Sequence, residues 1–139
     1  MSDADLRALF ERYVAVLNAH DFGRLHEFMH DDLVVNGAAM TRDQMIAGLE
    51  GHIAAVPDLT WRPQDVAIDG DRIAARFRNT GTPSSTWFGA EPNGAPVEYA
   101  EHVFHRVLNG RFHEQNFLLD EASIHRQLGS DPRLAPQID

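Results

Sequence analysis

VEYAEHVFHRVLNGRFHEQNFLLD, residues 97–120, is the stretch of the chain that decides the fold. Two runs rich in Val, Phe and Tyr flank Asn109-Gly110. Asn-Gly between such runs is the strongest short-range signal for a β-hairpin, because both residues tolerate the positive φ of a type I′ turn. The sequence therefore predicts two antiparallel strands joined by a two-residue turn.

The two-residue turn also predicts which side chains share a face of the sheet. His105 would lie opposite Glu114, and His102 opposite Phe117. One face would then carry His102, Phe104, Gln115 and Phe117, and the other Val103, His105, Val107, Phe112, Glu114 and Asn116. A β-bulge would shift this register by one residue and exchange the faces.

Length and composition indicate a single globular domain. The chain has 139 residues and 43% hydrophobic residues, which is normal for a soluble domain with one core. We expect one domain over residues 1–139, with a core of about residues 5–129. Residues 130–139, with two prolines, read as a C-terminal tail.

The charge balance argues against two classes of partner. The formal net charge is −9, with only 12 Lys and Arg, so we expect no binding to nucleic acid or to an anionic membrane. The absence of cysteine excludes disulfides and thiolate chemistry. The first residues lack the pattern of a signal peptide and no apolar run reaches membrane-spanning length, so the expected location is cytoplasmic.

The first third of the chain has a helical period. An amphipathic helix begins near the N-terminus, and Asp21 is placed to cap a second, short helix. Thr41 and Gln44 form the pattern of a capping box, from which a third helix runs until just before Pro57. A short strand, residues 33–36, separates the second and third helices.

From residue 57 onward the period becomes that of strands. Strands are expected near residues 60–68 and 73–78, followed by a long loop over 81–96, the hairpin and a last helical turn at 124–128. Three N-terminal helices followed by antiparallel strands indicate an α+β fold. A curved, mostly antiparallel sheet packed around the helices would bury both apolar faces.

Several short strings in this order resemble the SnoaL-like polyketide cyclase family, whose fold is the cone-shaped α+β barrel of the nuclear-transport-factor-2-like superfamily. The strings are Asn18-Ala-His-Asp21, Pro57-Asp-Leu59, Asp69-Gly-Asp-Arg-Ile-Ala74, Pro92-Asn-Gly-Ala-Pro-Val-Glu-Tyr99, Asn109-Gly-Arg111 and Gln127-Leu-Gly129. The resemblance covers roughly residues 5 to 129. It implies a deep pocket inside the cone.

The resemblance also exposes a departure from the family pattern. The family's cyclases have a Trp-Asp pair late in the last strand, whose aspartate is the general acid/base of an intramolecular aldol closure. Counting back from Gln127, this pair falls on Asn116 and Phe117. A phenyl ring cannot move a proton, so the family mechanism does not transfer intact.

His102 and Asn36 are the predicted catalytic residues. His102 would face the pocket opposite Phe117, where an imidazole with a pKa near neutrality can act as acid or base. Its alternative is a half-buried structural histidine. Asn36, at the end of the first strand, would polarise a substrate carbonyl, or would only form a turn with the glycine that follows.

The other site predictions concern binding and metals. Substrate contacts are expected from Tyr13, Trp61, Phe104, Gln115 and Phe117. Glu114 and His105 would form either an acid/base pair or a surface ion pair. His26 and His30 have metal-like spacing but are expected at an exposed helix end, so no metal site is predicted.

Together these features predict acid/base catalysis, without a cofactor, on a small apolar carbonyl or polyketide-like compound. The reaction would be a cyclisation, isomerisation or dehydration. The alternative is a non-catalytic ligand-binding or dimerisation module, which the phenylalanine in place of the aspartate favours. A hydrolase would need an acidic dyad that the sequence does not show. By resemblance, a homodimer is expected.

Overall fold

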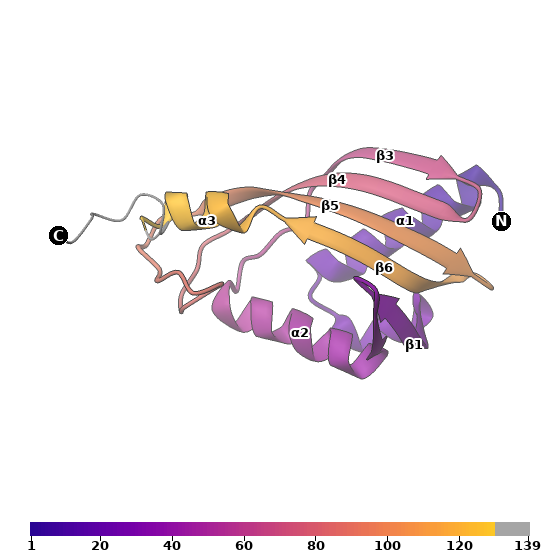
Figure 1. Cartoon of the computed structure of the whole chain (residues 1–139), viewed down its shortest axis with the longest axis horizontal. Helices are drawn as coiled ribbons and strands as arrows, with labels where there is room; N and C mark the ends of the chain where they lie inside the picture. The colour runs from indigo at the N-terminus through magenta and orange to yellow at the C-terminus, as the bar shows by residue number, and fades with distance from the viewer. Residues whose placement is uncertain (130–139) are drawn as a thin grey trace.

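A six-stranded mixed sheet dominates the computed structural model, which describes residues 1–129 (Figure 1). The elements are α1 (Asp3–Asn18), the 3-10 helix η1 (Phe22–Glu27), β1 (Met29–Val35), β2 (Ala38–Thr41), α2 (Arg42–Ala55), β3 (Pro63–Asp69), β4 (Arg72–Gly81), β5 (Val97–Leu108), β6 (Arg111–Leu119) and α3 (Glu121–Gln127). The predicted tail, residues 130–139, lies outside the described part of the chain.

The sheet has the strand order β2-β1-β6-β5-β4-β3. β1 and β6 pair in parallel, and the other neighbours pair antiparallel. Figure 1 shows α1 behind the sheet and α2 along one of its sides. The prediction of an α+β fold with a curved, mostly antiparallel sheet is confirmed.

The helix boundaries follow the capping signals with one correction. The Thr41 hydroxyl accepts a hydrogen bond from the backbone N–H of Gln44, and the Gln44 side-chain oxygen accepts one from the backbone N–H of Thr41, so the predicted capping box is present. As predicted, α2 ends before Pro57. The predicted second, short helix is present as a 3-10 helix over residues 22–27, but the predicted cap is wrong, because Asp21 makes no side-chain cap hydrogen bond. Phe22 and Leu25 are the buried residues of this helix, at the three-residue spacing of a 3-10 turn.

The hairpin begins as predicted and then departs from the predicted register. Asn109 and Gly110 both have positive φ, and Val107 lies opposite Phe112. Beyond this pair the register shifts, so that Arg106 lies opposite Glu114. This β-bulge leaves one extra residue in β6.

The bulge separates the four residues that were predicted to share a face. His105 now lies opposite Gln115, and Val103 opposite Phe117, all on the inner face toward the helices. His102 and Phe104 lie on the outer face of the sheet and are exposed. The predicted grouping of His102 and Phe104 with Gln115 and Phe117 is therefore wrong.

The core lies between α1 and the inner face of the sheet. Phe10 of α1 meets Phe77 of β4 edge to face, with ring centroids 5.9 Å apart. Phe112 of β6 is completely buried and packs against Tyr13 of α1 at 4.9 Å. Within residues 1–129, no helix combines the length and hydrophobicity that crossing a membrane requires.

Gly81 ends β4 at a point where the backbone passes very close to the segment that follows α2. A Cβ at this position would overlap the Val56 side chain and lie 3.3 Å from the Cα of Leu59. Backbone cannot move aside as a flexible side chain can. A glycine is therefore required here for packing.

We expect Gly81→Ala to destabilise the fold by about 1–3 kcal/mol, because the added methyl group overpacks this contact. Gly51→Ala is the matched control, since Gly51 is exposed in α2 with open space around it. Relief of the helix penalty of glycine should stabilise that variant by about 0.5–1 kcal/mol. Thermal unfolding measures both, and equal shifts in the two variants would contradict the close contact at Gly81.

Candidate functional site

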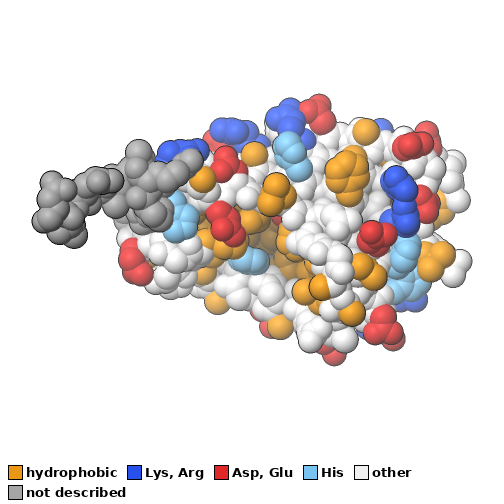
Figure 2. Space-filling model, viewed as in Figure 1, with side chains coloured by type: hydrophobic (Ala, Val, Ile, Leu, Met, Phe, Trp, Pro, Cys, Tyr) orange, Lys and Arg blue, Asp and Glu red, His pale blue; other side chains and the backbone are white. Residues whose placement is uncertain are grey.

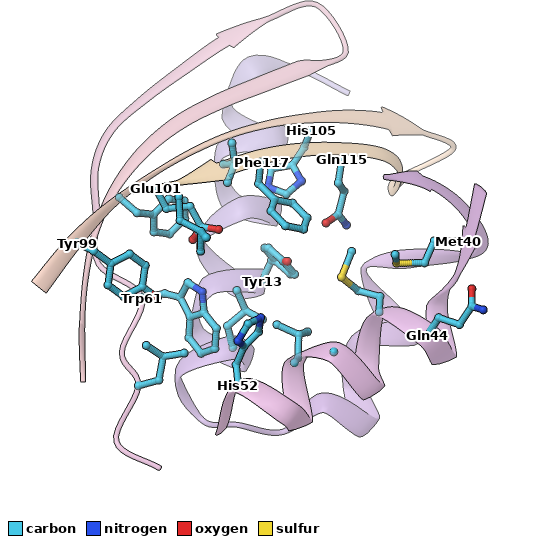
Figure 3. A pocket seen from close by; sticks show the side chains of 18 of the residues that line it. Tyr13, Met40, Gln44, His52, Trp61, Tyr99, Glu101, His105, Gln115 and Phe117 are labelled. Atoms are coloured by element: carbon cyan, nitrogen blue, oxygen red, sulfur yellow. The ribbon is translucent and has the colours of Figure 1, made fainter. Parts of the chain in front are cut away.

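A cavity of about 180 Å³ lies between α1, α2 and the inner face of the sheet. It appears in Figure 2 as a hollow with hydrophobic side chains inside, and Figure 3 shows its lining. An apolar cavity of about 150 Å³ is large enough to hold benzene. The cavity is also open to solvent at this hollow, so a ligand larger than one ring can extend outward.

Most of the lining is apolar or aromatic. The apolar and aromatic lining residues are Leu17, Met40, Met45, Leu49, Leu59, Trp61, Phe77, Trp87, Val103, Phe117 and Leu119. The polar ones are Tyr13, Gln44, His52, Tyr99, Glu101, His105 and Gln115. Neither lysine nor arginine is among the described lining residues, so nothing there compensates an anionic ligand.

Glu101 is the carboxyl group of the cavity. It lies on β5 between Tyr99 and Val103 in the inward-facing stripe, and only 8% of it is exposed. Burial raises its pKa to about 7, and a hydrogen bond from Asn79 offsets part of this shift. At neutral pH the carboxyl group is therefore present in both protonation states.

Asn79 of β4 fixes how this carboxyl group is held. The backbone N–H of Arg62 donates to Asn79 Oδ1 at 3.1 Å, so the amide nitrogen must point the other way. That nitrogen donates to Glu101 Oε1 at 2.9 Å. Because Oε1 accepts this bond, the proton of neutral Glu101 resides on Oε2.

Two tyrosines place hydroxyl groups in the same cavity. Burial raises the pKa of Tyr13 and of Tyr99, and the charge of Glu101 raises both further. Both hydroxyls therefore stay protonated at neutral pH and can donate hydrogen bonds. Figure 3 shows the Tyr99 ring beside Trp61 at one edge of the cavity and the Tyr13 ring nearer its centre.

Both histidines of the cavity are neutral. Trp87 donates its indole N–H to Nδ1 of His52 at 3.0 Å, which leaves the His52 proton on Nε2. Burial lowers the pKa of His52. Burial also lowers the pKa of His105 to about 3, where the ring stacks on Phe112 at 4.5 Å. Neither imidazole is a cationic acid at neutral pH.

Four of the predicted binding residues line the cavity. These are Tyr13, Trp61, Gln115 and Phe117. Their side chains come from α1, from the segment before β3 and from β6. Substrate contact by these four remains a prediction, while their common location in the cavity is a structural fact.

The predicted catalytic histidine lies elsewhere. His102 is exposed on the outer face, paired across the sheet with Arg76 and Leu118. The prediction that it faces the pocket is wrong, because the alternation of β5 turns Glu101 inward instead. Phe104, also predicted to line the pocket, is 59% exposed on the same outer face.

Asn36 also lies outside the cavity. Its φ of 49° and the glycine after it form the turn between β1 and β2. Its side-chain oxygen accepts a hydrogen bond from the backbone N–H of Phe117 at 2.8 Å. The turn interpretation therefore holds, and the amide ties β1 to β6.

Other predicted pairs are separate in the structure. His26 bonds the Gly23 carbonyl and His30 the Leu108 carbonyl, at 3.0 and 2.6 Å. Among the described residues no three potential ligands gather as a metal site would require. Glu114 lies near Arg106 on the outer face and not beside His105.

Sequence reasoning missed Glu101, Asn79 and His52. The available signal for Glu101 was its position in β5, where every second residue from Val97 to Val107 faces the core. A carboxylate in such a stripe is unusual and marks a special environment. No comparable signal marks His52 in its helix.

A family model for the SnoaL-like polyketide cyclases matches residues 7–128, nearly the whole described chain. This chain belongs to the SnoaL-like polyketide cyclase family. The match confirms the resemblance drawn from the short sequence strings, including those that surround the hairpin. Among curated proteins, none matches the chain.

Solved structures agree with this membership. A SnoaL-like polyketide cyclase from Agrobacterium tumefaciens is 30% identical, with a TM-score of 0.83 over 89% of this chain and 98% of that one. AclR, a candidate hydroxylase from Streptomyces galilaeus, is 25% identical, with a TM-score of 0.81 over 94% and 100%. IdmH, a candidate polyketide cyclase from Streptomyces antibioticus, is 26% identical, with a TM-score of 0.80 over 88% and 97%.

The raised pKa of Glu101 predicts how the stability of this SnoaL-like domain depends on pH. The folded state keeps the Glu101 proton up to about pH 7, while an unperturbed glutamate releases it near 4.5. The stability of the wild type relative to Glu101→Gln should therefore fall as the pH rises from 4.5 to 7. The total change corresponds to about 3 kcal/mol.

Denaturant unfolding of both proteins across this pH range measures the difference. Taking the difference cancels the histidines, whose lowered pKa values make stability rise with pH in the acidic range. A difference that is constant from pH 4.5 to 7 would contradict the raised pKa of Glu101.

Proposed function

We propose that this SnoaL-like domain catalyses proton transfer on a small, largely apolar carbonyl compound, with Glu101 as general acid and base. Cyclisation, isomerisation and dehydration all begin with such a step, and none needs a cofactor. The observation that carries the proposal is a buried carboxyl group with a pKa of about 7 inside an apolar cavity. A catalytic group works best when its pKa lies near the operating pH.

The proton transfer is written on the atoms that the cavity presents. Glu101 Oε2 takes a proton from the carbon next to the substrate carbonyl, and the C–H electron pair moves onto the carbonyl oxygen. The resulting enolate oxygen needs hydrogen-bond donors, which the Tyr13 hydroxyl and the His52 Nε2–H can supply. The enolate then attacks a second carbonyl, takes back the proton at another carbon or expels a leaving group.

The position of Glu101 supports the idea that the acid has moved between strands. By resemblance, the family aspartate falls on Phe117, which lines this cavity from β6. Glu101 enters the same cavity from β5, where Val103 is the residue opposite Phe117. The carboxyl group thus comes from the neighbouring strand, β5, two residues before the position that lies opposite Phe117.

A second candidate function is ligand binding without catalysis. Phe117 favours it, because the residue removes the carboxyl group that the family's cyclases use. The two candidates differ in one respect. A binding protein needs Glu101 only for affinity, whereas a catalyst needs it for turnover.

Deuterium incorporation next to a ketone distinguishes the two. We expect the wild type to accelerate exchange of 2-tetralone in D₂O above the buffer rate, observed by proton NMR. Glu101→Gln should lower kcat/KM by about 100-fold or more, since the amide cannot take a proton. For the wild type, kcat/KM should rise with pH and reach half its maximum near pH 7.

His102→Ala is the matched control, because His102 lies on the outer face and should leave exchange unchanged. Exchange that is equal in the wild type and Glu101→Gln would overturn the role of Glu101. Binding of 2-tetralone without any acceleration would favour the second candidate.

Asn79→Ala tests how the carboxyl group is positioned. Loss of the donated hydrogen bond removes a contact that favours the charged form, so the pKa of Glu101 should rise further. The midpoint of the exchange profile should therefore move to higher pH. Asn116→Ala, on the outer side of β6, should leave the midpoint in place. A midpoint that is unchanged or lower in Asn79→Ala would contradict this role.

A further inference from the structure

We propose that His105 and Gln115 form a second polar point in the cavity, which takes a hydroxyl group of the ligand. The ligand class is a phenol or enol carried on a flat apolar framework. This inference rests on the proposed function, because it assumes that the cavity binds a small molecule. It concerns the part of the ligand that lies away from Glu101.

The first observation is a pair of polar side chains that the described protein leaves unsatisfied. Gln115 is 2% exposed and His105 is 4% exposed, and they lie directly opposite each other on β6 and β5. Within residues 1–129, neither Nδ1 of His105 nor Nε2 of Gln115 has a hydrogen-bond partner. Leaving such a group buried and unpaired costs about 1–3 kcal/mol.

The second observation is that both residues belong to the cavity wall. Figure 3 shows the Gln115 side chain directed into the cavity beside His105 and Phe117. On the wall of a ligand cavity, the missing partner is one that the ligand brings.

The chemistry of the pair indicates a hydroxyl group. His105 is neutral, since burial lowers its pKa, and it therefore offers one donor and one acceptor nitrogen. The Gln115 amide also offers both roles and turns easily about its last torsion. A hydroxyl group donates and accepts, so it can satisfy both side chains. A carboxylate would find no cation among the described lining residues.

The position of the pair sets the length of the ligand. His105 lies four residues along β5 from Glu101, which corresponds to about 13 Å of strand. Figure 3 shows the Glu101 carboxyl group and the Gln115 amide on opposite sides of Phe117. A ligand that reaches both points is therefore elongated and larger than a single ring.

The test compares 2-naphthol with naphthalene, which differ only in the hydroxyl group. Isothermal titration calorimetry gives both Kd values for the wild type and for Gln115→Met, which keeps the length of the side chain and removes its polar atoms. We expect the wild type to bind 2-naphthol at least about 10-fold more tightly, and this preference to disappear in Gln115→Met. Naphthalene should bind both proteins equally well.

A second variant and a control keep the test independent of folding. His105→Phe preserves the stack on Phe112 and should also reduce the preference for 2-naphthol. Asn116→Leu, on the outer face, should retain it. Quenching of Trp61 and Trp87, the two tryptophans of the chain, reports that the ligands occupy this cavity.

The outcomes separate this inference from the proposed function. Equal affinity of the wild type for the two ligands, with ketone exchange intact, would overturn the hydroxyl site alone. An equal loss of affinity for both ligands in Gln115→Met would assign Gln115 to packing and would also overturn it. Failure of both ligands to bind, together with absent exchange, would overturn the proposed function as well.

Discussion

The alternation of β5 forces a carboxyl group into the apolar interior, and the properties of the site depend on this constraint. Glu101 occupies an inward position between aromatic and aliphatic neighbours, without a cation among the described lining residues to balance its charge. A buried, unpaired carboxylate is costly, so the protein lowers the cost by holding the proton up to about pH 7. Because its pKa is near 7, the buried carboxyl group can both give and take a proton at neutral pH.

The rest of the fold keeps the surroundings of this group neutral and fixed. Asn79 is locked by the Arg62 backbone and holds one carboxyl oxygen, which leaves the other for the ligand. Trp87 holds His52 in one tautomer, and the aromatic core keeps His105 uncharged. Hydrogen-bond donors in a dry cavity act more strongly than in water and need no rearrangement during a reaction.

The sequence predicted the elements better than the site, for identifiable physical reasons. The capping box at Thr41 and the turn at Asn109 depend on local chemistry, and both are present. The bulge that shifts the register of β6 has no comparable local signal, because none of residues 112–114 is a glycine or a proline. Because the bulge was not predicted, His102 was expected to face the pocket, although it lies on the outer face. Glu101, one residue earlier in the same strand, was overlooked.

A direct titration of the Glu101 carboxyl group tests the account most sharply. The ¹³C chemical shift of its side-chain carboxyl carbon can be followed by NMR from pH 3 to 9, with Glu101→Gln identifying the resonance. We expect a midpoint near pH 7, well above the ordinary value of 4.5. A midpoint close to 4.5 would show an ionised, hydrated glutamate and would contradict the role of Glu101 as the acid and base of the cavity.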